Sequence, residues 1–143
     1  MNRLFYLLLL AAFFTACKNE RPANGQSRIV FEPGGLKFIA SSLHPKQETM
    51  SALYGNDSAL QSLAGSEHQT TAGTMIKLVT WRYHDNPQYF GGKINGELLS
   101  IESIQTDSRG AVTYHLDFGT LQRPAAPTAR IAYIMTYKPV QIP

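Results

Sequence analysis

Cysteine is almost absent from this chain of 143 residues, because Cys17 is the only one. A single thiol cannot close a disulfide within the chain, and it excludes a zinc site built from several thiolates. Charge is also sparse: 13 Lys and Arg residues stand against 10 Asp and Glu residues, and the basic residues form no cluster with aromatic neighbours. This distribution argues against nucleic acid as a partner.

Long apolar runs are missing after residue 14, so no later segment is expected to span a bilayer. The one long run comes first: residues 4–14 are apolar and uncharged, they follow Arg3, and small residues lead from them to Cys17. This arrangement is typical of a secretory signal peptide and is short for a membrane span. The sequence therefore predicts export.

The end of this run, Phe14-Thr15-Ala16-Cys17, resembles the lipobox of bacterial lipoproteins. The resemblance implies cleavage of a signal peptide at residues 1–16, acylation of Cys17, and a periplasm-facing domain whose first partner is the membrane. An ordinary signal peptide with an incidental cysteine is the alternative. Residues 17–28 are polar, with Pro22 and Gly25, and predict a flexible tether. The remaining residues, 29–143, suffice for one domain.

Alternation of apolar and polar residues, broken by turn-forming residues, predicts a series of strands. These cover residues 36–44, 48–54, 73–83, 98–106, 111–118 and 130–137, with a short edge strand over 28–32. A helix is expected over residues 59–65, with Asn56, Asp57 or Ser58 as its capping residue. The fold class is therefore α+β: an antiparallel sheet of about five strands with one or two short helices packed on it.

The predicted strand at residues 73–83 is the only one that is apolar on both faces, so we expect it at the centre of the sheet. Alternation places Met75, Lys77, Val79 and Trp81 on one side. Lys77 is the unusual member. Either its amine is buried, which disfavours the charged form, or its methylenes follow the sheet and its ammonium group reaches solvent.

Four segments resemble the cytochrome P-460 family: residues 31–41, 48–60, 72–81 and 89–108. Members of that family and their cytochrome c′-beta relatives are periplasmic sheet proteins that hold one haem against the sheet. They bind nitric oxide or oxidise hydroxylamine. The resemblance implies a domain of this fold over residues 29–143, and it implies a homodimer, since the family often pairs through its sheet.

The same resemblance nominates site residues. Lys77 matches the strand lysine that is cross-linked to haem in the family, and Glu102 matches, less closely, a carboxylate near the distal pocket. Candidates for an apolar pocket wall are Met75, Val79, Trp81 and Phe90. Aromatic residues at strand spacing are more often simply part of an ordinary core.

The chain departs from the family at the haem attachment. Family members carry a C-x-x-C-H motif near the C-terminus, whereas here no cysteine follows Cys17 and no histidine follows His115. We therefore expect no cofactor. A haem, if present, would be held non-covalently, with His115 as the possible axial ligand. The other histidines lie in predicted turns without metal-ligand spacing, so no metal site is expected.

The sequence leaves three functional hypotheses. The first is a lipid-anchored, cytochrome P-460-like module without covalent haem that binds a small molecule or serves as an accessory to a protein partner. The second is a non-covalent haem protein that binds nitric oxide or oxidises small nitrogen compounds. The third is a structural envelope lipoprotein. No hydrolase motif such as G-x-S-x-G is present, so an enzyme is not favoured and no catalytic residue is nominated.

Overall fold

The computed structural model describes residues 30–65 and 70–140. The predicted signal peptide, Cys17 and the whole of the predicted tether lie outside these residues. The described elements are β1 (Lys37–His44), a 3₁₀ turn η2 (Pro45–Gln47), β2 (Thr49–Gly55), α2 (Asp57–Ala64), β3 (Met75–Asp85), β4 (Lys93–Thr106), β5 (Val112–Gly119) and α3 (Pro127–Ile134).

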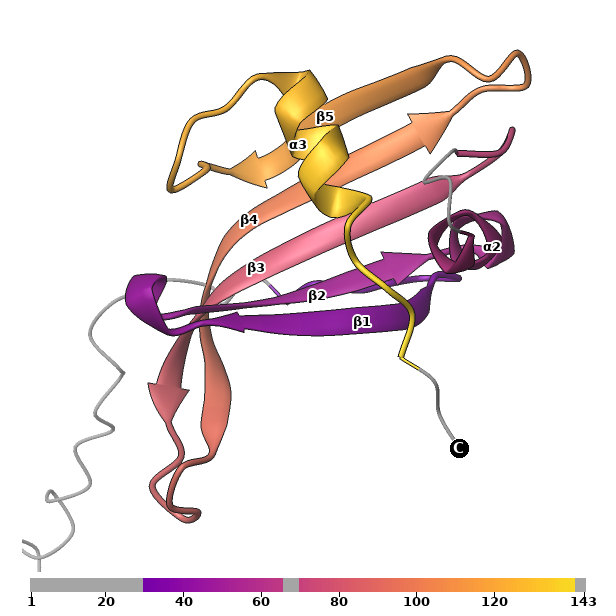
Figure 1. The fold of residues 1–143 in the computed structure, drawn as a ribbon. Coiled ribbons are helices and arrows are strands. Elements are labelled where there is room, and N and C mark those ends of the chain that lie inside the picture. The colour runs from indigo at the N-terminus through magenta and orange to yellow at the C-terminus, as the bar shows by residue number, and fades with distance from the viewer. Residues whose placement is uncertain (1–29, 66–69, 141–143) are drawn as a thin grey trace, which may run out of the picture.

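The strands form one antiparallel sheet in the order β1-β2-β3-β4-β5, so each strand pairs with its neighbour in sequence. The strand that was predicted to be central, β3, lies in the middle. Helix α3 crosses in front of the sheet, and α2 lies at one end of it (Figure 1). The prediction of an α+β fold, with about five antiparallel strands and one or two short helices, is confirmed by a sheet of five strands with two helices.

The core lies between the two helices and one face of the sheet, which we call the helix-covered face. Its strand residues include Leu53, Ile76, Leu78 and Ile104, all at most 1 % exposed. Buried residues of α2 and of the α3 region complete the same cluster: Ala59, Leu63, Ile134, Met135 and Tyr137. The opposite face, which we call the open face, carries Met75, Lys77, Val79 and Trp81 of β3.

Helix α2 begins where the sequence predicted a cap. The side chain of Asn56 accepts hydrogen bonds from the backbone N–H groups of Ala59 at 3.0 Å and Met75 at 3.2 Å. It also donates to the carbonyl of Gly73 at 2.8 Å. Of the three candidates, Asn56 therefore caps the helix, and it joins α2 to the start of β3.

Two predicted strands are wrong. The described part of the predicted edge strand, Val30 to Glu32, is not a strand, and the ring of Phe31 packs on Tyr54 at a centroid distance of 5.1 Å. Residues 130–137 were expected to form the last strand, but they belong to α3 and the turn that follows it. Pro127 occupies the first turn of this helix, where its missing N–H is not needed.

The hairpin between β3 and β4 is longer than predicted. Residues 84–93 were expected to form a loop, yet β3 continues to Asp85 and β4 starts at Lys93. Beyond Arg82 the two strands pair only with each other. They leave the sheet as a two-stranded arm, which points away from the rest of the domain in Figure 1.

Candidate functional site

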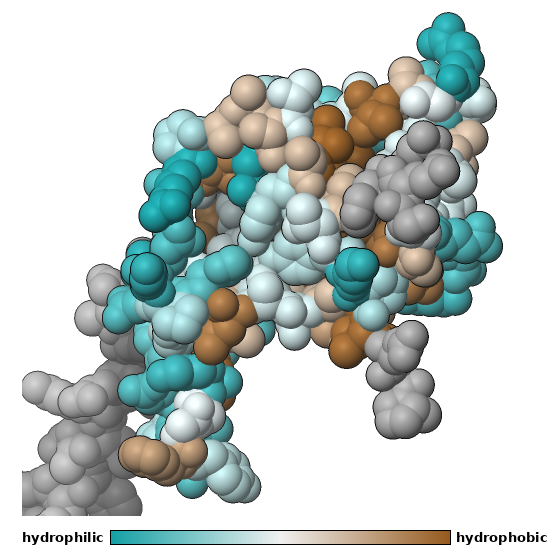
Figure 2. All heavy atoms as spheres, in the orientation of Figure 1, coloured by the Kyte–Doolittle hydropathy of each residue, from teal (hydrophilic) through white to brown (hydrophobic). Residues whose placement is uncertain are grey.

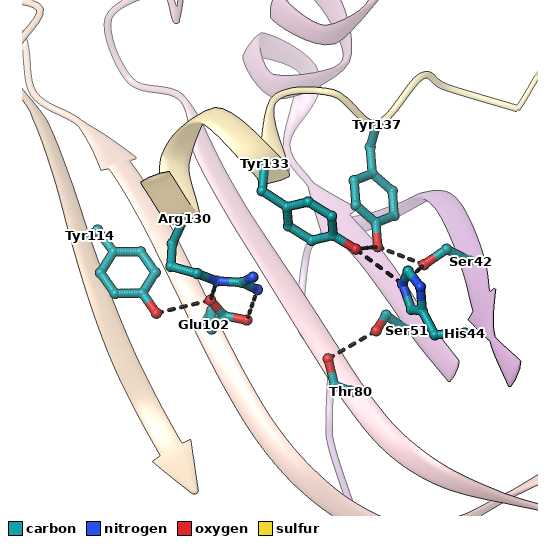
Figure 3. Close-up of polar contacts among 9 residues, drawn as sticks. All are labelled: Ser42, His44, Ser51, Thr80, Glu102, Tyr114, Arg130, Tyr133 and Tyr137. Atoms are coloured by element: carbon teal, nitrogen blue, oxygen red, sulfur yellow. Dashed lines mark hydrogen bonds and ion pairs between the residues drawn. The ribbon is translucent and has the colours of Figure 1, made fainter. Parts of the chain in front are cut away.

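A cavity of about 340 Å³ lies between the helix-covered face of the sheet and the chain that leads from β5 into α3. Twelve of its fifteen lining residues have polar or charged side chains. Hydroxyl and amide side chains come from three strands and the loops beside them: Gln47, Thr49, Ser51, Thr80, Ser100, Thr120 and Gln122. Ionisable side chains at the cavity are His44, Glu102, Arg123, Arg130 and Tyr133. Figure 3 shows six of these residues together with their polar partners.

Strand pairing explains why these side chains converge. Leu78 pairs with Glu102 and Thr80 pairs with Ser100, so all four point to the same side of the sheet. Leu78 belongs to the hydrophobic core. The polar side chains of Thr80, Ser100 and Glu102 lie beside it on the same face of the sheet and point into the same interior. The cavity begins where the apolar core ends.

Glu102 and Arg130 form the most buried ion pair of the described residues. Arg130 donates from Nε to Oε2 and from Nη2 to Oε1 of Glu102, both at 2.7 Å, and Tyr114 donates its hydroxyl to Oε2 at 2.9 Å. The side chains are 1 % and 19 % exposed for Glu102 and Arg130. The bond to Glu102 raises the pKa of Arg130, and burial followed by the Glu102 bond raises the pKa of Tyr114 to about 12.

A second polar network joins the end of β1 to the C-terminal side of α3 (Figure 3). Nε2 of His44 lies 3.0 Å from the Tyr133 hydroxyl and 3.3 Å from the Ser42 hydroxyl. The Tyr137 hydroxyl lies 2.6 Å from Ser42 Oγ and 3.2 Å from the Tyr133 hydroxyl. Burial, and next the bond with Tyr137, raises the pKa of Tyr133. Tyr133 therefore stays protonated, and its hydroxyl is engaged within this network.

The rim of the cavity is accessible to solvent. Thr120, Gln122 and Arg123 are exposed members of its wall. On the floor, the Ser51 and Thr80 hydroxyls lie 2.9 Å apart on neighbouring strands. A molecule that enters past the rim thus meets a row of hydroxyl groups that can both donate and accept hydrogen bonds.

Most residues nominated from the sequence lie on the open face. Met75, Lys77, Val79 and Trp81 alternate along β3 on the side opposite to Leu78. Val79 is fully buried, whereas Met75 is 38 % exposed. Glu102 alone lines the cavity, so Lys77 and Glu102 point to opposite faces of the sheet.

Of the two alternatives for Lys77, a buried amine or an ammonium group that reaches solvent, the structure shows the second. Its side chain is 31 % exposed, and Nζ lies 3.2 Å from Oδ2 of Asp117. His115 is also on the open face, in line with Lys77 through Ser103, and it is exposed. Asp117 accepts a bond from Ser103 at 2.9 Å.

Phe90 lies apart from both faces. It is in the turn at the tip of the β3–β4 arm, and its side chain is fully exposed. The structure therefore does not bring Phe90 to a pocket wall with Met75, Val79 and Trp81.

The residues present do not fit a haem. In the cavity, only three of the fifteen lining residues are apolar, and the one histidine there, His44, has Nε2 engaged with Tyr133 and Ser42. On the open face, a haem bound through His115 would cover the ion pair of Lys77 with Asp117 and would remove those charges from water. The cavity suits a small polar molecule better than a broad apolar macrocycle.

Within residues 30–65 and 70–140, no group of three or more His, Cys, Asp or Glu side chains is arranged to hold a metal ion. No helix in the described part of the chain is long and apolar enough to cross a membrane. Compared with known proteins, the chain matches no family model, and no curated protein matches it. The resemblance to cytochrome P-460 proteins thus rests on the four sequence segments and stays a prediction.

Of the residues that line the cavity, sequence reasoning nominated only Glu102 and missed, among others, His44, Arg130 and Tyr133. His44 was assigned to a turn, and the other two to a strand. A signal for the latter was present, since Arg130, Tyr133, Ile134 and Tyr137 have helical spacing and follow Pro127. This spacing puts their side chains on one face of α3, toward the sheet.

Proposed function

We propose that this protein is a lipid-anchored binding module, and that the cavity between α3 and the sheet holds a small hydroxylated molecule that carries negative charge. The observation that carries the proposal is the wall of the cavity. It combines hydroxyl and amide groups with an accessible rim and few apolar side chains. Such a wall binds ligands by directed hydrogen bonds.

The expected charge of the ligand follows from the ionisable groups. Glu102 and Arg130 neutralise each other in their two-point contact. Arg123 is exposed on the rim, and no ion pair of the described residues involves it. It therefore supplies a positive charge that a carboxylate or phosphate group on the ligand can use.

The sequence supports the same reading. The segments that resemble cytochrome P-460 proteins lie on the sheet, while the C-x-x-C-H motif that holds the family's haem is missing. A domain of this ancestry without its cofactor would retain the sheet and use the space beside it for another ligand. The lipobox-like end of the signal peptide would hold it at the membrane, facing the periplasm.

Calorimetric titration of the full chain in detergent tests this function. Gluconate is the probe, because it has several hydroxyl groups and one carboxylate, and glucitol is its uncharged counterpart. We expect gluconate to bind and glucitol to bind at least tenfold more weakly. Thr80→Leu, which fills the cavity, should abolish binding, whereas Thr113→Leu on exposed β5 should leave it unchanged.

Haemin is titrated in the same preparation to test the non-covalent haem alternative. A stoichiometric Soret band that is lost in His115→Ala or in His44→Ala would favour a haem protein. Absence of such a band, together with gluconate binding that depends on Thr80, supports the polar-ligand module. Inorganic phosphate is titrated as a second anionic probe. Failure of both gluconate and phosphate to bind would contradict the polar-ligand module.

A further inference from the structure

The β3–β4 arm, residues 83–95, projects beyond the sheet and ends in an aromatic tip. Three strand pairs, Tyr83 with Asn95, His84 with Ile94 and Asp85 with Lys93, hold it together. The turn at its end carries Phe90, whose side chain is fully exposed, and Tyr89, which is 69 % exposed. Figure 2 shows hydrophobic atoms at the end of this arm and mainly hydrophilic ones along it.

The tip is closed by its own hydrogen bonds. The N–H of Asn86 donates to the carbonyl of Gly92 at 2.8 Å, and the N–H of Gly92 donates to the carbonyl of Tyr89 at 3.0 Å. The Asn86 side chain accepts from the N–H of Gln88 at 2.9 Å. These bonds satisfy part of the backbone of the turn, which lowers the cost of moving it into a poorly hydrated environment.

Charge is absent from the tip, since residues 86–92 contain no Asp, Glu, Lys or Arg. The charges nearest to it are paired. Lys93 contacts Asp85 and lies over the ring of Tyr83 at 5.0 Å, and Nε of Arg82 lies 3.8 Å from Glu97. Any surface that the tip meets is therefore recognised through aromatic rings and not through net charge.

We propose that this tip inserts Tyr89 and Phe90 into the interfacial layer of the membrane to which the protein is anchored. The inference rests on the lipid anchor of the proposed function, but not on the cavity or its ligand. Twelve residues separate Cys17 from Val30 and span at most about 45 Å, so an acylated Cys17 would keep the domain close to the bilayer. Aromatic side chains with no charged neighbours are favoured at that depth.

Tryptophan fluorescence of the full chain in phosphatidylcholine vesicles tests the proposal. Phe90→Trp places a reporter at the tip, and Thr113→Trp places one at an exposed position on β5, away from the arm. The native Trp81 is present in every sample as a common background. Brominated phosphatidylcholine quenches tryptophan within the bilayer, and iodide quenches it in water.

We expect brominated lipid to quench the added fluorescence of Phe90→Trp strongly and to leave that of Thr113→Trp unchanged. Replacing part of the lipid with anionic phosphatidylglycerol should not increase the effect, because the charges of the arm are paired. If Phe90→Trp remains open to iodide and untouched by brominated lipid, the proposal is overturned, and a protein partner becomes the surface that the tip meets.

Flotation of the wild-type chain with the vesicles tests the lipid anchor separately from the insertion of the tip. Wild-type protein that fails to float would contradict the lipid anchor and overturn the insertion of the tip with it. Protein that floats with an exposed reporter at position 90 would overturn the insertion alone. Neither result bears on gluconate binding, which is measured in detergent.

Discussion

Arg130 of α3 and Glu102 of β4 are 28 residues apart in sequence and meet through two parallel hydrogen bonds of 2.7 Å. The contact fixes the first turn of α3 over the sheet, and Tyr114 of β5 donates a third bond to the same carboxylate. Glu102 is almost completely buried, so water cannot solvate its charge. The cation of Arg130 and the three hydrogen bonds take the place of water.

Removing Arg130 should therefore be costly. Arg130→Met keeps the length of the side chain but leaves the Glu102 carboxylate buried and without its cation. We expect the free energy of unfolding to fall by about 3–5 kcal/mol, as measured by urea denaturation near neutral pH.

The double variant Glu102→Gln/Arg130→Met is the control for this prediction, because it removes both charges. It should recover most of the lost stability. A double variant no more stable than Arg130→Met would mean that packing of the arginine, and not its pairing with Glu102, supports α3.

Tyr114 gives a prediction at high pH. Burial and the Glu102 bond raise its pKa to about 12, above the value of about 10 for an unfolded tyrosine. The protonated phenol therefore contributes stability that is complete below pH 10 and is lost as the pH rises through 12. Urea denaturation across this range should show a decline that Tyr114→Phe makes shallower. Tyr89→Phe, which changes an exposed tyrosine, should decline like the wild type.

Gly55 has no space for a side chain. A Cβ there would lie 2.6 Å from the Cβ of Ala59 and 2.7 Å from Cδ1 of Ile39, at the contact of β2 with α2. Gly55→Ala should lower the free energy of unfolding by about 1–3 kcal/mol through overpacking. Gly35→Ala is the matched control, because nothing lies within 4 Å of its Cβ position. Equal stability of the two variants in thermal unfolding would contradict this account of the packing.

Lys77 distinguishes the cavity from the site that the family resemblance implies. Its ion pair with Asp117 is partly exposed and lies on the face opposite to the cavity. Lys77→Met should change stability by less than about 1 kcal/mol and leave gluconate affinity unchanged. A large loss of binding in calorimetry would place the ligand on the open face and support the role that the sequence resemblance implies for Lys77.

The sheet was predictable because its strands have local signals. Residues such as Val112 and Tyr114 alternate with polar ones, short turns separate the strands, and neighbouring strands pair in sequence order. Helix α3 was not predicted, because Ile131, Tyr133 and Met135 also fit a strand period. In a run of eight residues, both periods match, and only packing of Ile134 and Tyr137 against the sheet decides between them.

The cavity was not predictable, because it depends on contacts between distant segments. His44, Glu102 and Tyr133 have no spacing that marks a site, and they meet only once β1, β4 and α3 have packed. Strand pairing predicts that Glu102 and Lys77 point to opposite faces of the sheet. It does not predict which of the two faces the helices cover.

The measurement that tests the cavity most directly is an amide NMR titration of the full chain in detergent with gluconate. The account predicts that resonances of cavity residues such as Thr80, Ser100 and Thr120 shift and saturate, that those of Lys77 and His115 do not, and that Thr80→Leu removes the shifts. Saturating shifts confined to the open face, or shifts that persist in Thr80→Leu, would contradict it.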